Sequence, residues 1–495
     1  MTQSWKLLRQ RCADKLEEYR FLLKPFIILS VVYLFAISAI LRANVYYIDD
    51  LGRARMGYAF WENYARHLSV FFSHILHADE YLTDVSPLTQ IIAVFLMALA
   101  SVLAIYILSD NKKISFWSLV AIIPLGLNPY FLECFSYKYD SPYMAFSVLA
   151  AIFPLLFYKG NWKTYSIVSV LSILCMCMTY QVSTGIYPML VVLVCIRRWI
   201  SGDEIKEILK FAVVSAVSYV IGILAFNKFF IVEEYTDFPT DIVTLDQLIP
   251  NAIGHYKSYV KLFLQDFKVE WLILIAVICA AFLYVTIRHT KQYRILTAIL
   301  AVPALAGLFA LSFGVYPFLV KPGFEPRCMY GIGCFIAFLG VYVVSAAPKV
   351  YPAKLACLVL SWAFFVFAFT YGNALDAQST YTDFRLEQAV EDLVDSGVLA
   401  TEGTKSVRIT GTIGHSLVIR NMPQDYQILN RMVPVNFSDS QWWWGSFKLL
   451  HYYGFTNLEH NGTDDLSTMD LPLIADNVYH TIRANEEYIW IDLHQ

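Results

Sequence analysis

Apolar residues occur in long, nearly uncharged stretches along most of the chain, and polar residues are confined to the segments between them. About eleven of these stretches have roughly 15–23 residues, the length that a helix needs to cross about 30 Å of hydrocarbon. Several are at the short end of that range, so tilt or local thinning of the bilayer must be tolerated. The stretches cover residues 25–41, 87–108, 114–130, 142–158, 164–179, 185–200, 211–230, 270–287, 295–317, 329–346 and 355–372.

The composition points to the same class of protein. Hydrophobic residues make up 58% of the chain and charged residues 16%, whereas soluble globular domains have about 45–50% apolar and about 25% charged residues. These proportions exclude a soluble globular protein. The sequence therefore predicts an α-helical polytopic membrane protein with about eleven spans.

Positive charge in the short connections predicts how the chain lies in the membrane, because Lys and Arg near helix ends are retained in the cytoplasm. After a basic N-terminus, every second connection is short and basic. With an odd number of spans, these connections all fall on the cytoplasmic side and the C-terminus lies outside. Their basic residues are Lys112, Lys113, Lys159, Lys163, Arg197, Arg198, Lys206, Lys210, Arg288, Lys291, Arg294, Lys349 and Lys354.

This orientation divides the chain into three parts. Residues 1–24 form either a helix on the cytoplasmic membrane surface or a basic tail that only sets the topology. Residues 25–373 form the membrane domain, whose large outer loops are residues 43–86 and 231–269. Residues 374–495 form a polar outer domain.

The outer domain has the pattern of a small α/β fold. The segment Asp383–Ser396 places its apolar residues on one face of a helix, which Gly397 ends. Strand-like runs follow at residues 406–410, 417–420 and 488–493.

Acidic and basic residues are almost absent from the middle of every predicted span. A carrier coupled to ions or protons needs ionisable groups near the membrane midplane, where they are costly to bury. Here they gather at the outer ends of the spans, which suits a cleft that receives a lipid headgroup from one side and a polar acceptor from the other. The residues at these outer ends are Asp49, Asp50, Glu133, Lys138, Asp140, Glu233, Glu234, Lys321, Glu325 and Arg327.

Two acidic motifs give the chain a specific resemblance. The run YYIDD at residues 46–50 lies a few residues after the first span, and YKYD at residues 137–140 lies between the third and the fourth. Together with the many short spans and the polar outer domain, they make the whole chain resemble the GT-C membrane glycosyltransferases, in which a first-loop acidic residue or pair is a hallmark. Within that superfamily it resembles the serotype-converting glucosyltransferases that decorate bacterial O-antigen.

The resemblance implies a reaction and a compartment. Such a protein spans the bacterial inner membrane many times and moves glucose, or a related hexose, from an undecaprenyl-phosphate donor to an O-antigen lipopolysaccharide acceptor in the periplasm. Its partners are the lipid-linked donor, the polysaccharide acceptor and the membrane lipids, with no nucleic acid. Neither a cofactor nor a metal is expected.

The residue types fit that reaction. Asp50 is the expected general base for the acceptor hydroxyl, with Asp49 holding it or binding acceptor hydroxyls, and the two roles could be exchanged. The leaving phosphate needs cations rather than an acid, so Arg327 and Lys321 are expected to bind it, whereas Arg53 in the first loop is given no phosphate role. A single displacement inverts the anomeric centre, by analogy with inverting glycosidases. The residues expected to bind substrate are Asp140, Lys138 and Tyr137.

Plainer interpretations stand beside these roles. Asp49 and Asp50 could simply end a helix in the headgroup layer, and Asp140 could be the N-cap of the fourth span. Lys321 and Arg327 could pair with phosphates of the bilayer itself.

Two further groups of residues have alternative interpretations. His74 and His77 stand three apart with Asp79 nearby and could hold a metal, but a solvated helix face is the plainer interpretation. Cys134 and Cys328 fall in outward connections, where a disulfide is chemically permitted.

A flippase or carrier for a lipid-linked sugar or polysaccharide is the competing function. It predicts strongly polar residues inside the spans and substantial inner loops, and this sequence has neither. A glycosyltransferase is therefore the favoured hypothesis.

Overall fold

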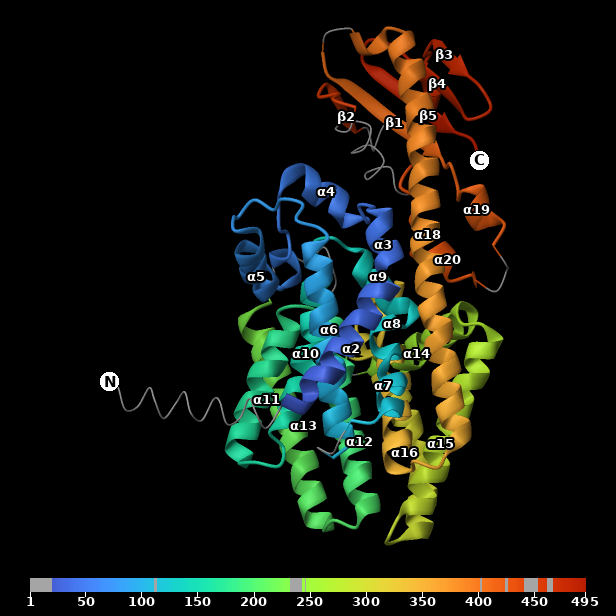
Figure 1. The fold of residues 1–495 in the computed structure, drawn as a ribbon. Coiled ribbons are helices and arrows are strands. Elements are labelled where there is room, and N and C mark those ends of the chain that lie inside the picture. Colours follow the sequence, from blue (N-terminus) through green and yellow to red (C-terminus); the bar gives the residue numbers. More distant parts are fainter. Residues whose placement is uncertain are drawn as a thin grey trace.

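In the computed structural model, a bundle of helices carries a small sheet at one end, and one long helix joins the two parts (Figure 1). The structure describes residues 20–110, 114–231, 243–244, 246–400, 403–422, 426–439, 453–460 and 466–495. Most of the predicted segment 1–24, the early part of loop 231–269 with Glu233 and Glu234, and the pair Lys112 and Lys113 lie outside the described residues.

Every apolar stretch predicted to span the membrane is helical in the structure. The first and the third are broken. The first gives α2 and α3, which are separated at Ile37. The third gives α7 and α8, which are separated at Ile123, just before Pro124. The helices of the bundle are α2 (Leu23–Ala36), α3 (Ser38–Ala43), α6 (Leu88–Leu108), α7 (Phe116–Ile122), α8 (Pro124–Leu127), α10 (Ser141–Ile152), α11 (Trp162–Cys177), α12 (Ile186–Ser201), α13 (Ile205–Phe229), α15 (Val269–His289), α16 (Arg294–Leu311), α17 (Gly331–Ala346) and α18 (Tyr351–Asp395).

The structure supports fewer membrane spans than the eleven predicted. Among the described residues, six helices are long and apolar enough to cross a membrane: α6, α12 with the turn before it, α13, α15, α16 and α18. A seventh is the bent pair Phe116–Leu127 and Pro129–Ser136, whose two halves meet at 57°. Apolar helices such as α11 and α17 have only 16 residues, which at about 1.5 Å per residue is roughly 24 Å, short of the hydrocarbon thickness.

The α17 helix lies at the centre of the bundle. Fourteen of its 16 residues are buried, because it is apolar on all sides and can therefore be surrounded by other helices. The long α18 helix packs beside α3, where a side chain at Gly372 would lie 2.5 Å from the Ala39 carbonyl carbon. Glycine at this position lets the two backbones approach closely, and this contact holds the start of the first outer loop against the bundle.

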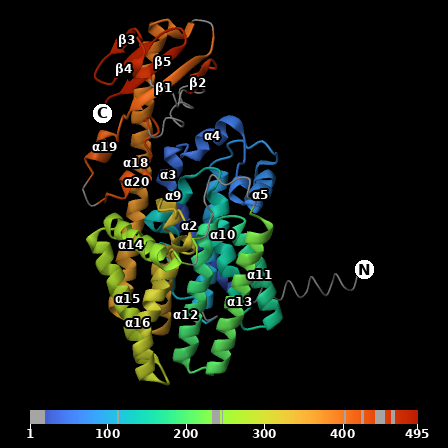
Figure 2. The ribbon, with the colours of Figure 1, turned by 180° about the vertical axis from the view of Figure 1, so that it is seen from behind.

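The connections at the two ends of the bundle differ in their charge and in their size. The turns joining α12 to α13 and α15 to α16 lie at the end opposite the sheet (Figures 1 and 2). The helix ends next to these turns carry the basic residues Arg197, Arg198, Arg288 and Arg294. The end nearest the sheet carries the first outer loop with α4 (Asp49–Met56) and α5 (His67–His77), and α9 (Pro129–Ser136).

The outer domain contains a five-stranded sheet with the strand order β2-β1-β5-β4-β3. Strand β1 is parallel to both of its neighbours, and β4 is antiparallel to both β5 and β3. The end of α18 packs Leu386, Ala389 and Leu393 against the sheet. The strands are β1 (Lys405–Gly411), β2 (Leu458–His460), β3 (Leu473–Asp476), β4 (His480–Ala484) and β5 (Tyr488–Leu493).

The strands predicted at residues 406–410 and 488–493 are confirmed. One other prediction for this domain is wrong, and one is correct except for where the helix begins. The segment Leu417–Arg420 forms the short helix α19 rather than a strand. Its start is tied to α18, because the Ser416 amide donates a 2.8 Å hydrogen bond to Gln378 Oε1. The helix predicted to begin at Asp383 is the last part of α18, which runs without a break through 45 residues.

Candidate active site at the sheet-facing end

The YYIDD motif ends a turn and begins α4. Ile48, just before the helix, has φ +41°, a strained conformation for a β-branched residue. It turns the chain so that Asp49 and Asp50 form the first turn of α4, where carboxylates interact favourably with the helix dipole. The pair therefore begins a helix rather than ending one, and the contacts of the two residues distinguish their roles.

Asp50 is completely buried, and its carboxylate accepts hydrogen bonds from three backbone amides. The amides of Tyr47 and Lys138 donate to Oδ2 at 3.1 and 2.8 Å, and the Tyr139 amide donates to Oδ1 at 3.3 Å. Burial raises the pKa of Asp50 to about 8, with a further rise from the charge of Asp140, although the backbone donors and Arg53 oppose it. Asp50 therefore ties the first outer loop to the YKYD motif.

Asp49 differs from its neighbour. It is half-buried, and within the part of the chain that the structure describes its carboxylate makes neither a hydrogen bond nor an ion pair. It is close enough to Arg53 and Tyr137 to act electrostatically on both. Asp49 thus has an acceptor capacity that Asp50 lacks.

Asp140 belongs to a buried ion pair. Arg53 Nη1 lies 2.5 Å from Asp140 Oδ2, and Trp61 Nε1 donates to Oδ1 at 2.6 Å. The Arg53 guanidinium also lies over the Trp61 ring, 4.7 Å from its centroid. Asp140 occupies the N-cap position of α10, as one interpretation expected, but its side chain makes no capping hydrogen bond and binds Arg53 and Trp61 instead.

Arg53 is therefore part of the site, a role that sequence reasoning missed. Its position three residues after Asp50 places both residues on the buried face of α4. Because Arg53 is the buried partner of Asp140, removing it would leave an uncompensated carboxylate. It cannot serve as a neutral control for the other cations.

Lys138 and Tyr137 are also buried near this pair. Lys138 Nζ forms a 3.1 Å ion pair with Asp84 Oδ2 and lies 4.0 Å from the centroid of the Tyr46 ring. The Tyr137 ring packs edge-on against Tyr47, with 4.8 Å between the ring centroids. Among the described residues, the buried Tyr137 hydroxyl has no hydrogen-bond partner.

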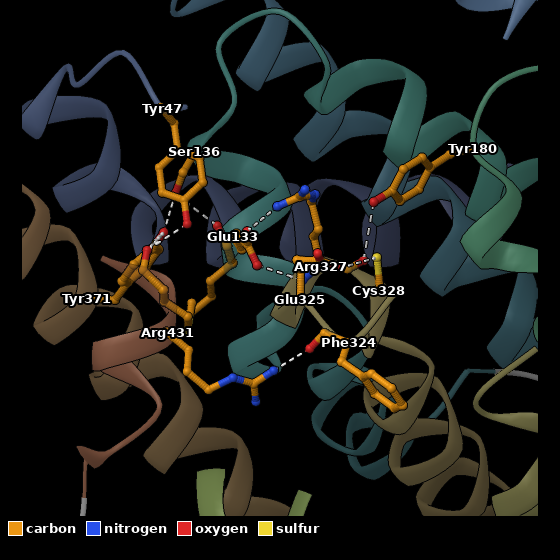
Figure 3. Close-up of polar contacts among 12 residues, drawn as sticks. Tyr47, Glu133, Ser136, Tyr180, Phe324, Glu325, Arg327, Cys328, Tyr371 and Arg431 are labelled. Atoms are coloured by element: carbon orange, nitrogen blue, oxygen red, sulfur yellow. Dashed lines mark hydrogen bonds and ion pairs between the residues drawn. The ribbon is translucent and has the colours of Figure 1, made fainter. Parts of the chain in front are cut away.

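Arg327 is held by Glu133, a residue of α9. The Arg327 backbone amide donates to Glu133 Oε2 at 2.6 Å, and its Nη1 donates to Oε1 at 3.0 Å (Figure 3). The Glu133 side chain is 2% exposed, whereas that of Arg327 is 25% exposed. One side of the guanidinium is thus fixed by an ion pair while part of it stays accessible, a geometry suited to meeting an anion.

Tyr137 marks the point where the two groups of charges meet. The charged groups that lie near enough to act on its hydroxyl are Arg327, Asp49, Glu133 and Asp140. Burial raises the pKa of Tyr137 well above its usual value; Arg327 opposes this rise, and the nearby carboxylates add to it. Six of the seven residues predicted for the site therefore lie together around the first loop and the turn after α9: Asp49, Asp50, Tyr137, Lys138, Asp140 and Arg327.

Lys321 is the predicted residue that the structure does not bring into this group. It is exposed, and in the described parts of the chain its ammonium has no hydrogen bond or ion pair. The charges that act on Tyr137 do not include it. Its position six residues before Arg327 leaves it at the rim.

A residue of the outer domain also reaches the site. Arg431, on α20 (Leu429–Met432), forms an ion pair with Asp266 and donates to the carbonyl oxygen of Phe324 (Figure 3). Phe324 belongs to the same outer loop as Arg327. The next carbonyl, that of Met432, accepts a 2.7 Å hydrogen bond from the Tyr47 hydroxyl.

These contacts connect three regions far apart in the sequence. Asp266 ends α14 (Leu248–Asp266) and also accepts a 2.8 Å hydrogen bond from the Tyr130 hydroxyl of α9. Nothing in the local sequence around Arg431 signals this role, because its partners are 107 and 165 residues away.

The structure also bears on the possible metal site at His74 and His77 and on the possible disulfide between Cys134 and Cys328. His77 is buried and its ring stacks on Tyr139 with 5.7 Å between centroids, so a solvated helix face is the wrong interpretation for it. The described residues contain no group of three or more His, Cys, Asp and Glu that could hold a metal. Cys134 and Cys328 are both buried and free.

Comparison with known proteins assigns the same region to a family. A family model described as "Glucosyl transferase GtrII" matches residues 38–338, which include every residue predicted for the site. The chain is also 23% identical over 445 residues to a protein of Salmonella phage P22 described as "Uncharacterized 55.3 kDa protein in gtrB 5'region", and the match covers 86% of this chain and 88% of that protein. No solved structure matches the chain.

Proposed function

Because this chain belongs to the glucosyl transferase GtrII family, we propose that it transfers glucose, or a related hexose, from a polyprenyl-phosphate donor to an O-antigen acceptor in the periplasm. The observation that carries this proposal is the meeting of an unoccupied carboxylate and a partly exposed guanidinium around Tyr137. Asp49 supplies the carboxylate and Arg327 the guanidinium.

The proposed reaction is a single displacement. The acceptor hydroxyl oxygen forms a bond to the anomeric carbon, its proton passes to Asp49, and the bond from that carbon to the phosphate oxygen breaks with its electron pair on the phosphate. Arg327 stabilises the charge that grows on the leaving phosphate. The acceptor attacks opposite the leaving group, so the anomeric configuration inverts.

The contacts of the two aspartates favour the exchanged assignment of their roles. The lone pairs of Asp50 already face three backbone amides, so Asp50 is better suited to positioning than to accepting a substrate proton. Asp49 has no such partners in the described chain and is the better general base. Glu133 then orients Arg327, and Asp140, Lys138 and Tyr137 form the wall against which the sugar binds.

The proposed location is the inner membrane, with the sheet-bearing domain in the periplasm. Seven crossings, made by the six long helices and the bent pair, would place the two termini on opposite sides, and the basic connections gather at the end of the bundle away from the sheet. The positive-inside tendency puts that end in the cytoplasm. The candidate active site is then at the periplasmic headgroup level.

The direct test is to incubate purified protein with polyprenyl-phosphate glucose and candidate O-antigen polysaccharides, and to follow transfer of one hexose by mass spectrometry. We expect the acceptor to gain the hexose and the Asp49→Asn variant to lose this activity. A protein that transfers no hexose but moves the lipid-linked sugar between the leaflets of a vesicle would be a flippase, and the proposal would be wrong.

A further inference from the structure

A polar cavity lies at the end of the bundle opposite the sheet. It has a volume of about 450 Å³ and is formed where α6 and α12 end and where α11 and α13 begin. Its charged lining consists of Lys159, Arg197, Arg198, Asp110, Asp203 and Glu207. The proposed transfer reaction uses none of these residues.

Four of the six charges in this cavity neutralise one another. Lys159 Nζ lies 2.7 Å from Asp110 Oδ1, and Arg198 Nε lies 2.8 Å from Asp203 Oδ2. Two charges of opposite sign remain. They are the guanidinium of Arg197 and the carboxylate of Glu207.

The structure describes no partner for either of these two groups. Arg197 makes no hydrogen bond or ion pair with any described residue, and its Nη1 atom is buried. Glu207, in the first turn of α13, is exposed at the cavity and its carboxylate is likewise unpaired within the described chain. A buried guanidinium nitrogen without an acceptor is costly, so a ligand that supplies an anionic oxygen would stabilise this arrangement.

The two remaining charges, Arg197 and Glu207, favour a ligand that carries both an anionic and a cationic group. A phosphodiester oxygen can accept hydrogen bonds from the planar guanidinium of Arg197, and a primary ammonium can donate to Glu207. A purely anionic headgroup would satisfy the first group but be repelled by the second. The aromatic residues Tyr158 and Trp162 also line the cavity, and such residues are enriched at the level of lipid headgroups.

We propose that this cavity binds the zwitterionic headgroup of a phosphatidylethanolamine-type lipid, with the phosphate on Arg197 and the ammonium on Glu207. The cavity lies among the basic connections at the end of the bundle, where a bilayer would place its headgroups. The site is separate from the candidate active site, so it stands independently of the transfer reaction.

Lipid retention by the purified full chain tests this inference. The protein is mixed in detergent with equal amounts of phosphatidylethanolamine, phosphatidylcholine and phosphatidylglycerol, and bound lipid is counted by native mass spectrometry. We expect phosphatidylethanolamine to be retained best, because phosphatidylcholine lacks ammonium donors and phosphatidylglycerol lacks the cation. Arg197→Gln should weaken its binding by about tenfold or more, as expected for the loss of a hydrogen bond to a charged group.

Matched variants distinguish this site from general effects on the protein. Arg197→Lys should keep part of the binding, and Glu207→Gln, which changes an exposed side chain, should abolish the preference for phosphatidylethanolamine over phosphatidylglycerol. Arg288→Gln and Glu204→Gln change exposed charges outside the cavity and should change neither result.

Two results would overturn the inference. One is equal retention of the three lipids by the unmodified protein, and the other is an unchanged lipid preference in Glu207→Gln. Competition with soluble glycerophosphoethanolamine separates the two sources of this headgroup chemistry. We expect it to displace the lipid only at great excess because it lacks acyl chains, and displacement at equimolar concentration would mean that the ligand is a free metabolite instead of a lipid.

Discussion

Replacing each of the two adjacent aspartates by asparagine should separate a catalytic role from a positioning role. Asp49→Asn preserves the shape of the side chain and removes its basicity. Because Asp49 has no hydrogen bond or ion pair in the described chain, its replacement should leave the free energy of unfolding nearly unchanged. Turnover should fall by roughly 10²–10⁴-fold, the usual contribution of a general base.

The effect of Asp50→Asn can be worked out from its three backbone donors. An asparagine offers one oxygen where the aspartate offers two. If that oxygen takes the place of Oδ2 and accepts from Tyr47 and Lys138, the new amide group faces the Tyr139 amide and one buried donor loses its acceptor. Such a loss costs roughly 1–3 kcal/mol in the free energy of unfolding, and turnover should fall because the YKYD turn is displaced.

The assay measures hexose transfer and thermal unfolding for both variants in the same detergent. Donor binding should persist in Asp49→Asn, so that its defect appears in kcat and not in KM. The reasoning is refuted if Asp49→Asn transfers hexose at a near-normal rate while Asp50→Asn is inactive and as stable as the unmodified protein. That result would return the role of general base to Asp50.

Four more predictions follow from the site. Burial raises the pKa of Asp50 to about 8, so the folded state binds more protons than the unfolded state between about pH 4 and pH 8. Stability should therefore fall as pH rises through this window and level off above it. Asp50→Asn should flatten this profile when it is measured by thermal unfolding. Arg327→Lys keeps the charge but loses the planar fork, so it should retain part of the transfer activity, whereas Arg327→Ala should lose nearly all of it. Arg431→Gln should raise the KM for the donor and lower turnover by about tenfold, because it releases the loop that carries Arg327 from the outer domain. A reporter that is active only outside the inner membrane should work when fused to Gln495.

Each of these predictions has a control and a contrary outcome. A stability profile that is unchanged by Asp50→Asn would mean that Asp50 is not the group that titrates. Arg288→Ala, an exposed cation at the other end of the bundle, is the control for Arg327, and equal activity in the two alanine variants would reduce Arg327 to an interface anchor. Arg420→Gln, at an exposed position on α19, is the control for Arg431. A reporter at Gln495 that works only in the cytoplasm would reverse the proposed orientation.

Local patterns predicted several elements of this protein well. The apolar stretches are helices because, without water, only the helix satisfies the backbone within a single segment. The strand at residues 488–493 was predicted with the bounds that the structure has, since its apolar and polar residues alternate with the period of a strand. The composition of YYIDD and YKYD likewise led to the candidate site, because carboxylates at the outer ends of apolar helices are seldom incidental.

The length of the crossings and the extent of α18 were less predictable. Hydropathy measures how apolar a segment is, but a break such as the one before Pro124 depends on how the two halves pack. The strand predicted at Leu417–Arg420 became a helix because its start is held by a hydrogen bond from Ser416 to Gln378. Tertiary contacts of this kind routinely override a short propensity signal.

The sequence by itself determined that this protein is a helical membrane protein, which end of the bundle holds its acidic and phosphate-binding candidates, and which family it resembles. Only the tertiary structure decided which contacts each of those candidates makes, and therefore which role each one suits. Asp49 and Asp50 are chemically identical neighbours, yet the fold surrounds one with three backbone donors and leaves the other without a described partner. It also brings Arg431 to the carbonyl of Phe324 from 107 residues away. Periodicity and charge are local properties of a chain, whereas hydrogen-bond partners depend on which distant segments pack together, and only the folded chain contains that information.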